Sequence, residues 1–228
     1  MTTAGRFNFR YGKLEARAKI PSGDWLWPAI WMMPQDSKYG GWPRSGEIDI
    51  LESRGNKNLV AWGGNIGTQL AFSTLHWGKS PGENKFQKTH YEKRRNDGYD
   101  SDYHKYMVEW TPDYIAFKID DQEIGRIAPP AGGFYQFGQL SGDNPWGGGS
   151  KMAPFDQNFY LIVNLAIGGT NGYFPDESTN PNGKPWKNWS KQASRDFWNG
   201  NWQWRHTWNE RDDSQRALKV DYIKIWAI

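Results

Sequence analysis

The sequence predicts an all-β protein, a sandwich or barrel of short antiparallel strands in a single domain. Residues 13–20 (K-L-E-A-R-A-K-I) alternate apolar and charged side chains, which indicates a strand with one buried face. Similar runs recur along the 228 residues, and the 26 glycines and 13 prolines fall mostly between them, where turns need them. No long run shows the helical period of 3.6 residues. Short strands separated by turns are typical of sandwiches and barrels.

Further strands are expected later in the chain, each rich in β-branched or aromatic residues. They are Tyr106–Trp110, Tyr114–Ile119, Phe159–Ile167 and Leu218–Trp226. Asp120-Asp121 reads as the tip of a hairpin that joins Ile115–Ile119 to Glu123–Ile127. The polar runs 78–102 and 177–216 are expected to be long loops. Residues 1–228 are expected to form one domain, because no linker or repeat divides them.

Composition argues against several classes of function. The 28 basic and 25 acidic residues leave a formal charge of +3, too balanced to favour a nucleic-acid partner. The basic cluster Lys93-Arg94-Arg95 is expected in a solvated loop. The absence of cysteine excludes disulfides and thiol catalysis. No stretch approaches the roughly 20 apolar residues of a membrane span, and Met1-Thr2-Thr3 is not a secretory signal.

Aromatic residues are more abundant than a core of this size requires. The chain has 15 Trp, 11 Tyr and 11 Phe. Tryptophan is large and carries a polar N–H, so it suits a wet, concave surface that faces sugar rings. We expect a groove lined by a substantial share of these tryptophans, with the rest in the core.

The segment 45–56 (S-G-E-I-D-I-L-E-S-R-G-N) places Glu47, Asp49 and Glu52 within six residues of otherwise apolar, strand-like sequence. A desolvated carboxylate without partners is costly, so three together need a reason. Two carboxyl groups that face one sugar ring are what glycoside hydrolysis requires. The alternative is an edge strand whose acids lie in water, but the acids interleave with apolar residues and tryptophans crowd the flanks.

The spacing of the acids predicts a bulge. Side chains of a strand alternate faces, so Glu47 and Asp49 share one face and Glu52 would point to the other. One extra residue would bring Glu52 back, and β-bulges often re-aim side chains beside active sites. We therefore predict a bulge within Ile50–Glu52.

The segment resembles the catalytic signature of glycoside hydrolase family 16 in its bulged form, E-I-D-I-x-E, which is typical of endo-1,3-β-glucanases (laminarinases). The licheninase branch has an unbulged E-x-D-x-E. The continuation S-R-G-N resembles the animal branch, which includes invertebrate laminarinases and β-glucan recognition proteins. Further blocks resemble the family in the family's order: Trp25–Pro34, Ser73–Gly78, His104–Pro112, Asn164–Pro175 and Val220–Trp226.

The resemblance implies a β-jelly roll of two curved antiparallel sheets with a substrate groove on the concave face. It implies that Glu47 is the nucleophile and Glu52 the general acid/base of a retaining hydrolase, with carboxyl groups about 5–5.5 Å apart. Asp49 would lie between them, hydrogen-bond the nucleophile and help to keep the acid/base protonated. The three carboxyls would titrate as a coupled set.

Substrate-binding residues are expected around these acids. Trp27 and Trp31 are four apart, so on a strand they share a face, and both could meet the sugar before the scissile bond. Trp42 precedes Glu47 across a Pro-containing turn and could line the same subsite. His76 would lie near the acid/base, and Asn164 at a groove edge. For each tryptophan the alternative is core packing. Of the other histidines, His104 is expected to be structural, and His90 and His206 to lie in surface loops.

No cofactor is expected for catalysis. The resemblance implies a possible structural calcium on the convex face, with Asp221 as the matching carboxylate. Family members usually have further N-terminal strand sequence before the block resembling Gly5–Ile20, which weakens that expectation. No cluster has transition-metal spacing.

The sequence thus indicates a retaining endo-hydrolase of laminarin-like β-1,3-glucan that can also transglycosylate, secreted by resemblance and monomeric by default. A non-catalytic β-glucan-binding, pattern-recognition protein is the alternative, although such relatives have lost catalytic carboxylates. A same-fold hydrolase of mixed-linkage glucan or a marine galactan is the third reading. The bulge disfavours a strict licheninase, and the scarcity of basic groove residues disfavours a sulfated galactan.

Overall fold

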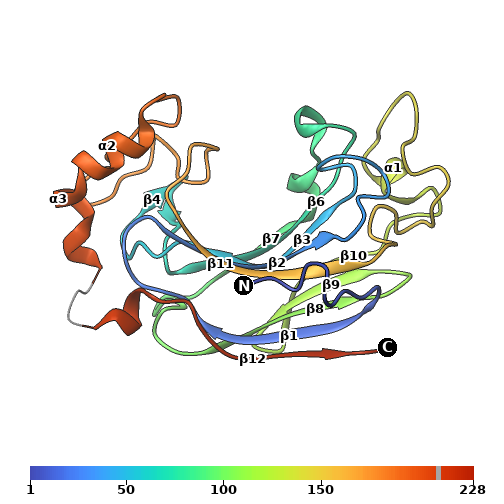
Figure 1. The fold of residues 1–228 in the computed structure, drawn as a ribbon, viewed down its shortest axis with the longest axis horizontal. Helices are drawn as coiled ribbons and strands as arrows, with labels where there is room; N and C mark the ends of the chain where they lie inside the picture. The colour runs from blue at the N-terminus through green and yellow to red at the C-terminus, as the bar shows by residue number, and fades with distance from the viewer. Residues whose placement is uncertain (209–211) are drawn as a thin grey trace.

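A computed structural model, which describes residues 1–208 and 212–228, shows two curved five-stranded antiparallel sheets packed as a jelly roll (Figure 1). The lower sheet in Figure 1 has the order β10-β9-β8-β1-β12, and the upper sheet has the order β11-β2-β3-β6-β7. The lower strands are β1 (Gly12–Lys19), β8 (His104–Trp110), β9 (Ile115–Ile119), β10 (Gln122–Ile127) and β12 (Lys219–Trp226). The upper strands are β2 (Leu26–Pro34), β3 (Glu47–Ser53), β6 (Leu70–His76), β7 (His90–Arg94) and β11 (Phe159–Ile167).

The remaining elements are short. A two-stranded hairpin pairs β4 (Val60–Ala61) with β5 (Gly64–Asn65). The helices are α1 (Gly133–Phe137), α2 (Ala193–Asn199) and α3 (Asn201–Trp204), with 3-10 turns at Pro81–Glu83, Phe86–Thr89, Arg205–Thr207 and Asp213–Arg216. No helix among the described residues is long and apolar enough to cross a membrane.

The strands predicted from alternation are confirmed to within about two residues, the usual uncertainty of element ends. The Asp120-Asp121 hairpin tip is also confirmed: both residues have positive φ angles, 50° and 64°, as a tight two-residue turn requires. The all-β class is confirmed, and the α-helices within residues 1–208 and 212–228 have at most seven residues.

The two long-loop predictions are wrong in part. Residues 78–102 contain β7, which pairs antiparallel with β6 and extends the upper sheet. Lys93 and Arg94 therefore belong to an edge strand rather than to a solvated loop, and a polar sequence suits such a strand because an edge must resist further pairing. Residues 177–216 contain α2, α3 and two of the 3-10 turns. Four buried or partly buried aromatics hold these short helices in place: Trp25, Trp186, Phe197 and Trp204.

The main core lies between the two sheets. Leu14, Ala16 and Ala18 from β1 are fully buried, and so are Ile30 and Met32 from β2. Because side chains alternate along β2, this inward set leaves Trp27 and Trp31 on the opposite, concave face. The alternation that builds the core thus also presents the aromatic residues of the groove.

The predicted bulge is present at Ile50 of β3. Trp31 pairs with Asp49 and Ile30 with Leu51, so Ile50 has no partner on β2. Against β6, Asp49 pairs with Thr74 and Glu52 pairs with Phe72. This interval is three residues long on β3 but only two on β6, so β3 carries one extra residue. Ile50 and Leu51 are both buried, 1% and 0% exposed, so both face the core and Glu52 returns to the face of Asp49.

The N-terminal segment runs beside the free edge of the upper sheet. The Met1 amino group donates to the Val163 carbonyl at 2.8 Å, and Phe9 forms a bridge with Phe159. The segment therefore covers backbone groups of β11 that an edge strand would leave unpaired.

Deletion of Ile50 tests the bulge. A regular ladder would result, with Glu52 still opposite Phe72, so we expect the variant to fold. Loss of the buried side chain should cost about 2–5 kcal/mol and lower the Tm by roughly 5–15 °C. Circular dichroism melting measures this shift.

Deletion of Ile48 is the matched control. It removes an equally buried isoleucine from the same strand, but from a regular part of the ladder. The side chains that precede the deletion would then point to the opposite face of the sheet. We expect that variant not to fold. Equal losses of stability in the two deletion variants would contradict the assignment of Ile50 as the extra residue.

Candidate active site

The concave face of the upper sheet is built from alternate residues of its five strands. A cleft of about 650 Å³ lies over β6 and β7, and a smaller one of about 210 Å³ lies over β2 and β11. Trp27, Glu47 and Glu52 line both clefts, so the carboxylates stand where the two meet. Trp42 and His76 line the larger cleft, and Trp31, Asp49 and Asn164 the smaller.

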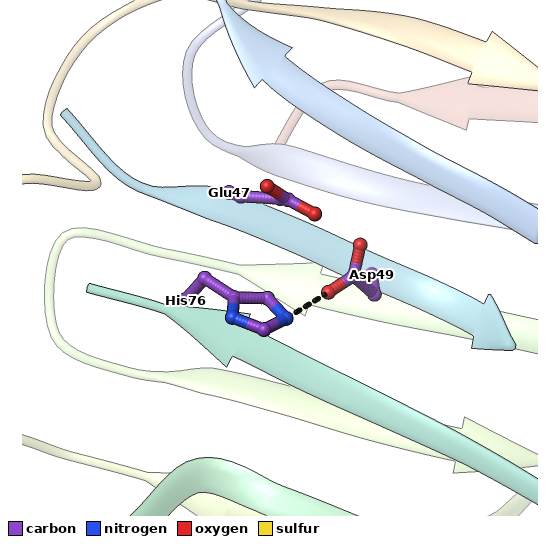
Figure 2. Close-up of side chains that lie close together, drawn as sticks. All are labelled: Glu47, Asp49 and His76. Carbon is purple, nitrogen blue, oxygen red and sulfur yellow. Dashed lines mark ion pairs between the residues drawn. The ribbon is translucent and has the colours of Figure 1, made fainter. Parts of the chain in front are cut away.

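The carboxylates project from one strand. Figure 2 shows Glu47 and Asp49 on β3 and His76 on the neighbouring β6, with the imidazole directed at Asp49. His76 Nε2 lies 3.3 Å from Asp49 Oδ2, and one ligand atom from each of the three residues lies within 4.8 Å of the others. Gly46, with a φ of +84°, makes the turn that brings the chain into β3.

Two indole N–H groups hold the outer carboxylates. Trp42 Nε1 donates to Glu47 Oε2 at 2.5 Å, and Trp27 Nε1 donates to Glu52 Oε1 at 2.9 Å. A donor to a carboxylate stabilises its charged form and fixes its orientation. A metal ion could also bind carboxylates this close, but the indole donor on Glu47 favours a hydrogen-bonded acid over a cation ligand. Both tryptophans thus contact the acids directly as well as lining the groove.

Burial raises the pKa of all three acids. The pKa of Glu47 rises to about 8, first because of desolvation and then because of the charge of Asp49, against a lowering by His76 and by Trp42. The pKa of Glu52 rises to about 7, again mainly through desolvation, opposed by the Trp27 hydrogen bond and by His76. The pKa of Asp49 is well above its ordinary value, because of burial and the charge of Glu52. The cleft therefore retains protons on its acids near neutral pH.

The orientation of His76 is set by Asn84. The Asn84 side-chain oxygen accepts from the backbone N–H groups of Trp77 and Phe86, at 3.3 and 3.2 Å, which assigns its amide nitrogen to the other side. That nitrogen lies 2.8 Å from His76 Nδ1, so Nδ1 accepts and Nε2 carries the hydrogen that faces Asp49. The N–H of His76 therefore faces the central carboxylate at ion-pair distance.

On the opposite side, Trp31 Nε1 donates to Asn164 Oδ1 at 2.7 Å, which links β2 to β11. Trp27 stacks on Tyr173, with ring centroids 3.7 Å apart and planes 9° from parallel. This pair offers a flat aromatic wall beside Glu52. Tyr173 was not singled out in the sequence, although it lies in the N-G-Y-F-P part of the Asn164 block.

The other histidines lie away from the carboxylates. His104 is buried and its Nδ1 lies 2.7 Å from Asp120 Oδ2, as expected of a structural residue. His206 is exposed. The prediction of a surface loop for His90 is wrong: His90 begins β7, is half-buried, contacts the Thr74 hydroxyl at 2.9 Å and lines the larger cleft.

The surroundings of Asp221 do not fit a calcium ion. The carboxylate lies 2.6 Å from the guanidinium of Arg17, which already supplies a positive charge. In the described parts of the chain, the close grouping of three potential metal-ligating side chains is the one at Glu47, Asp49 and His76.

Comparisons with known proteins identify the family of this chain. Residues 1–138 match the model of the glycosyl hydrolases family 16. A β-1,3-glucan-binding protein of Penaeus monodon is 47% identical over 99% of this chain, and a glucan endo-1,3-β-glucosidase of Cryptopygus antarcticus is 37% identical over 90% of it. The chain covers 61% and 66% of those relatives, and 44% of a β-1,3-glucan-binding protein of Tenebrio molitor.

The solved structures that resemble the chain include laminarinases. The laminarinase catalytic domain of Thermotoga maritima superposes with a TM-score of 0.62 at 25% identity, over 100% of this chain and 68% of that one. The laminarinase of Rhodothermus marinus gives a TM-score of 0.60 at 26% identity, over 99% of this chain and 69% of that one. With the jelly roll and the cleft, these matches show that the chain belongs to glycosyl hydrolase family 16.

Proposed function

We propose that this chain is a retaining endo-hydrolase of β-1,3-glucan. One observation carries the proposal: Glu47 and Glu52 project from one strand into the same cleft, each held by an indole N–H. An oriented pair of carboxyls beside aromatic surfaces is the arrangement that glycoside hydrolysis by double displacement needs. The glucan names carried by the relatives support the substrate class.

The reaction follows from the roles of the two glutamates. Glu47 attacks the anomeric carbon while Glu52 protonates the leaving oxygen, which gives a glycosyl ester on Glu47. Glu52, now ionised, takes a proton from water, and that water releases the sugar with its configuration retained. Asp49 lies between them, with its Oδ2 3.3 Å from His76 Nε2, and it positions charge without bonding to the sugar.

The proton balance needs one ionised and one protonated glutamate. In the free cleft the pKa of Glu47 is about 8 and that of Glu52 about 7, which is the reverse of the order that the reaction needs. We assign the roles from the positions in the motif rather than from this order. Positive charge that develops on the sugar favours ionised Glu47, and the Trp42 N–H stabilises the same form.

The larger cleft is open along the sheet, from Trp42 past Phe72 to Trp62 on the β4–β5 turn. An open cleft suits attack within a long chain, and it also lets a second sugar take the place of water, which is transglycosylation. The Trp27–Tyr173 pair is suited to stacking against the apolar face of a glucosyl ring.

We further propose that the protein is secreted and acts as a monomer.

A non-catalytic glucan-binding protein is the second candidate. The names of several relatives favour it, including those from Penaeus monodon and Tenebrio molitor. The chain spans about six-tenths or less of those two relatives, so the activity of a whole protein of that kind is also a proposal. The intact, oriented carboxyls favour the enzyme. A third reading is a mixed-linkage hydrolase. Comparison of the product linkages released from laminarin and from barley glucan distinguishes it from a β-1,3-glucan hydrolase.

Substitution of the glutamates tests the proposal. Glu47→Gln and Glu52→Gln should each lower reducing-sugar release from laminarin by at least about 100-fold, since each removes a group that takes part in the chemical step. Binding of laminarin, measured by calorimetry, should persist in both variants. Glu123→Gln, an exposed change on the lower sheet, is the control and should keep parent activity. A parent that binds laminarin but releases no sugar would make the binding protein the better account.

The raised pKa values predict a stability effect with a definite sign. A carboxyl whose pKa is raised on folding stabilises the fold below its unfolded pKa of about 4.5 and loses that contribution as the pH rises through its folded pKa. Glu52→Gln should therefore raise the Tm at pH 8 by roughly 3–8 °C, and much less at pH 4. Thermal melts at both pH values check this.

Glu123→Gln is the matched control for the melts. Arg126 lowers the pKa of Glu123, so this change has the opposite sign and should give no gain at pH 8. An equal gain for Glu52→Gln at pH 4 and pH 8 would show that the stabilisation does not come from the proton balance.

A further inference from the structure

Arg54 is a buried cation without an acidic partner. It follows β3 directly, is 5% exposed and lines the larger cleft. Its Nε and Nη2 donate to the Tyr173 carbonyl at 2.9 and 2.7 Å, and its Nη1 donates to the Ile66 carbonyl at 3.1 Å. Within the described chain, no carboxylate oxygen lies within ion-pair distance of the guanidinium. A buried, uncompensated charge costs several kcal/mol, so its place needs a reason.

A continuous set of contacts leads from Arg54 to the proposed acid/base. The guanidinium lies over the Tyr173 ring, 4.1 Å from its centroid. The Tyr173 hydroxyl donates to the Ser53 carbonyl at 2.9 Å, and the ring stacks on Trp27. Trp27 in turn donates to Glu52 Oε1. Arg54 therefore holds Tyr173 in place. Tyr173 in turn packs against the indole of Trp27, which donates to the Glu52 carboxyl.

We propose that Arg54 is a positioning residue that sets the acid strength of Glu52, through its own charge and through Tyr173 and Trp27. The inference deepens the proposed function and rests on it. The guanidinium interacts with carbonyl oxygens rather than with a carboxylate, so its charge is not neutralised locally. That charge acts on Glu52 across a desolvated site, where electrostatic effects are strong.

The effect has a definite direction. When Glu52 gives its proton to the leaving oxygen it becomes a buried anion, and a nearby cation stabilises that anion. Arg54 lowers the pKa of Glu52 in this way, together with the larger contributions of Trp27 and His76, while burial and Glu47 raise it. The charged or titratable groups around Glu52 are Glu47 and Asp49 on β3, His76 on β6, His90 and Glu92 on β7, Tyr173, and Arg54 itself.

The first test does not depend on hydrolysis. Carboxyl carbons of glutamate are titrated by NMR in the parent, Arg54→Gln, Arg54→Lys and Arg17→Gln. In Arg54→Gln the pKa of Glu52 should rise by about one pH unit, the size typical of a nearby charge. Arg54→Lys keeps the charge and should recover most of that shift. Arg17→Gln, on the lower sheet, removes a distant cation and should leave the pKa unchanged.

A second variant guards against misfolding of Arg54→Gln. Trp27→Phe leaves Arg54 in place and breaks the last hydrogen bond of the set, so it should also raise the pKa of Glu52. An unchanged pKa of Glu52 in Arg54→Gln would overturn the proposal. If that variant does not fold, an unchanged pKa in Trp27→Phe would overturn it.

The kinetic test separates acid strength from general damage. A weaker acid slows departure of a sugar leaving group, but it matters little for a dinitrophenyl leaving group, which needs no proton. Arg54→Gln should therefore lose several-fold more in kcat on laminari-oligosaccharides than on the dinitrophenyl glycoside, up to about tenfold for a pKa change of about one unit. Equal losses on both substrates would show that Arg54 has only a structural role. Absence of hydrolysis in the parent would overturn the proposed function while leaving the NMR result to stand.

Discussion

The placement of all three acids on the concave face depends on how β3 accommodates one extra residue. Ile50 lies between two regular stretches of the ladder, and both Ile50 and Leu51 face the core. If the ladder ran regularly through all six residues from Glu47 to Glu52, Glu52 would point into the core with the apolar residues. With the bulge, Glu47, Asp49 and Glu52 share the concave face, and the hydrogen bonds from Trp42 and Trp27 become possible.

The cost of this arrangement is electrostatic. Three acids on one desolvated face keep protons near neutral pH, and each ionisation raises the pKa of the next. The indole donors of Trp27 and Trp42 reduce that cost, and so does the electrostatic effect of His76 and Arg54. The proposed hydrolysis needs one ionised and one protonated carboxyl, which this balance would supply, and natural proteins often give up stability at functional sites.

Much of the fold was predictable from alternation, because a one-sided buried strand has a strict period of two. The bulge was predictable because the third acid broke that period. The polar strand β7 was missed because an edge strand buries little and lacks apolar alternation. Arg54 and Tyr173 were missed as a pair because 119 residues separate them, and nothing local in the sequence indicates that a guanidinium donates to a distant carbonyl.

Trapping of the glycosyl ester tests the central claim most directly. A 2-fluoro laminaribiosyl fluoride slows both chemical steps but carries a good leaving group, so the ester should accumulate. Peptide mass spectrometry should then find the added disaccharide on Glu47. Label on Glu52, or absence of label from a protein that binds laminarin and folds normally, would contradict the account.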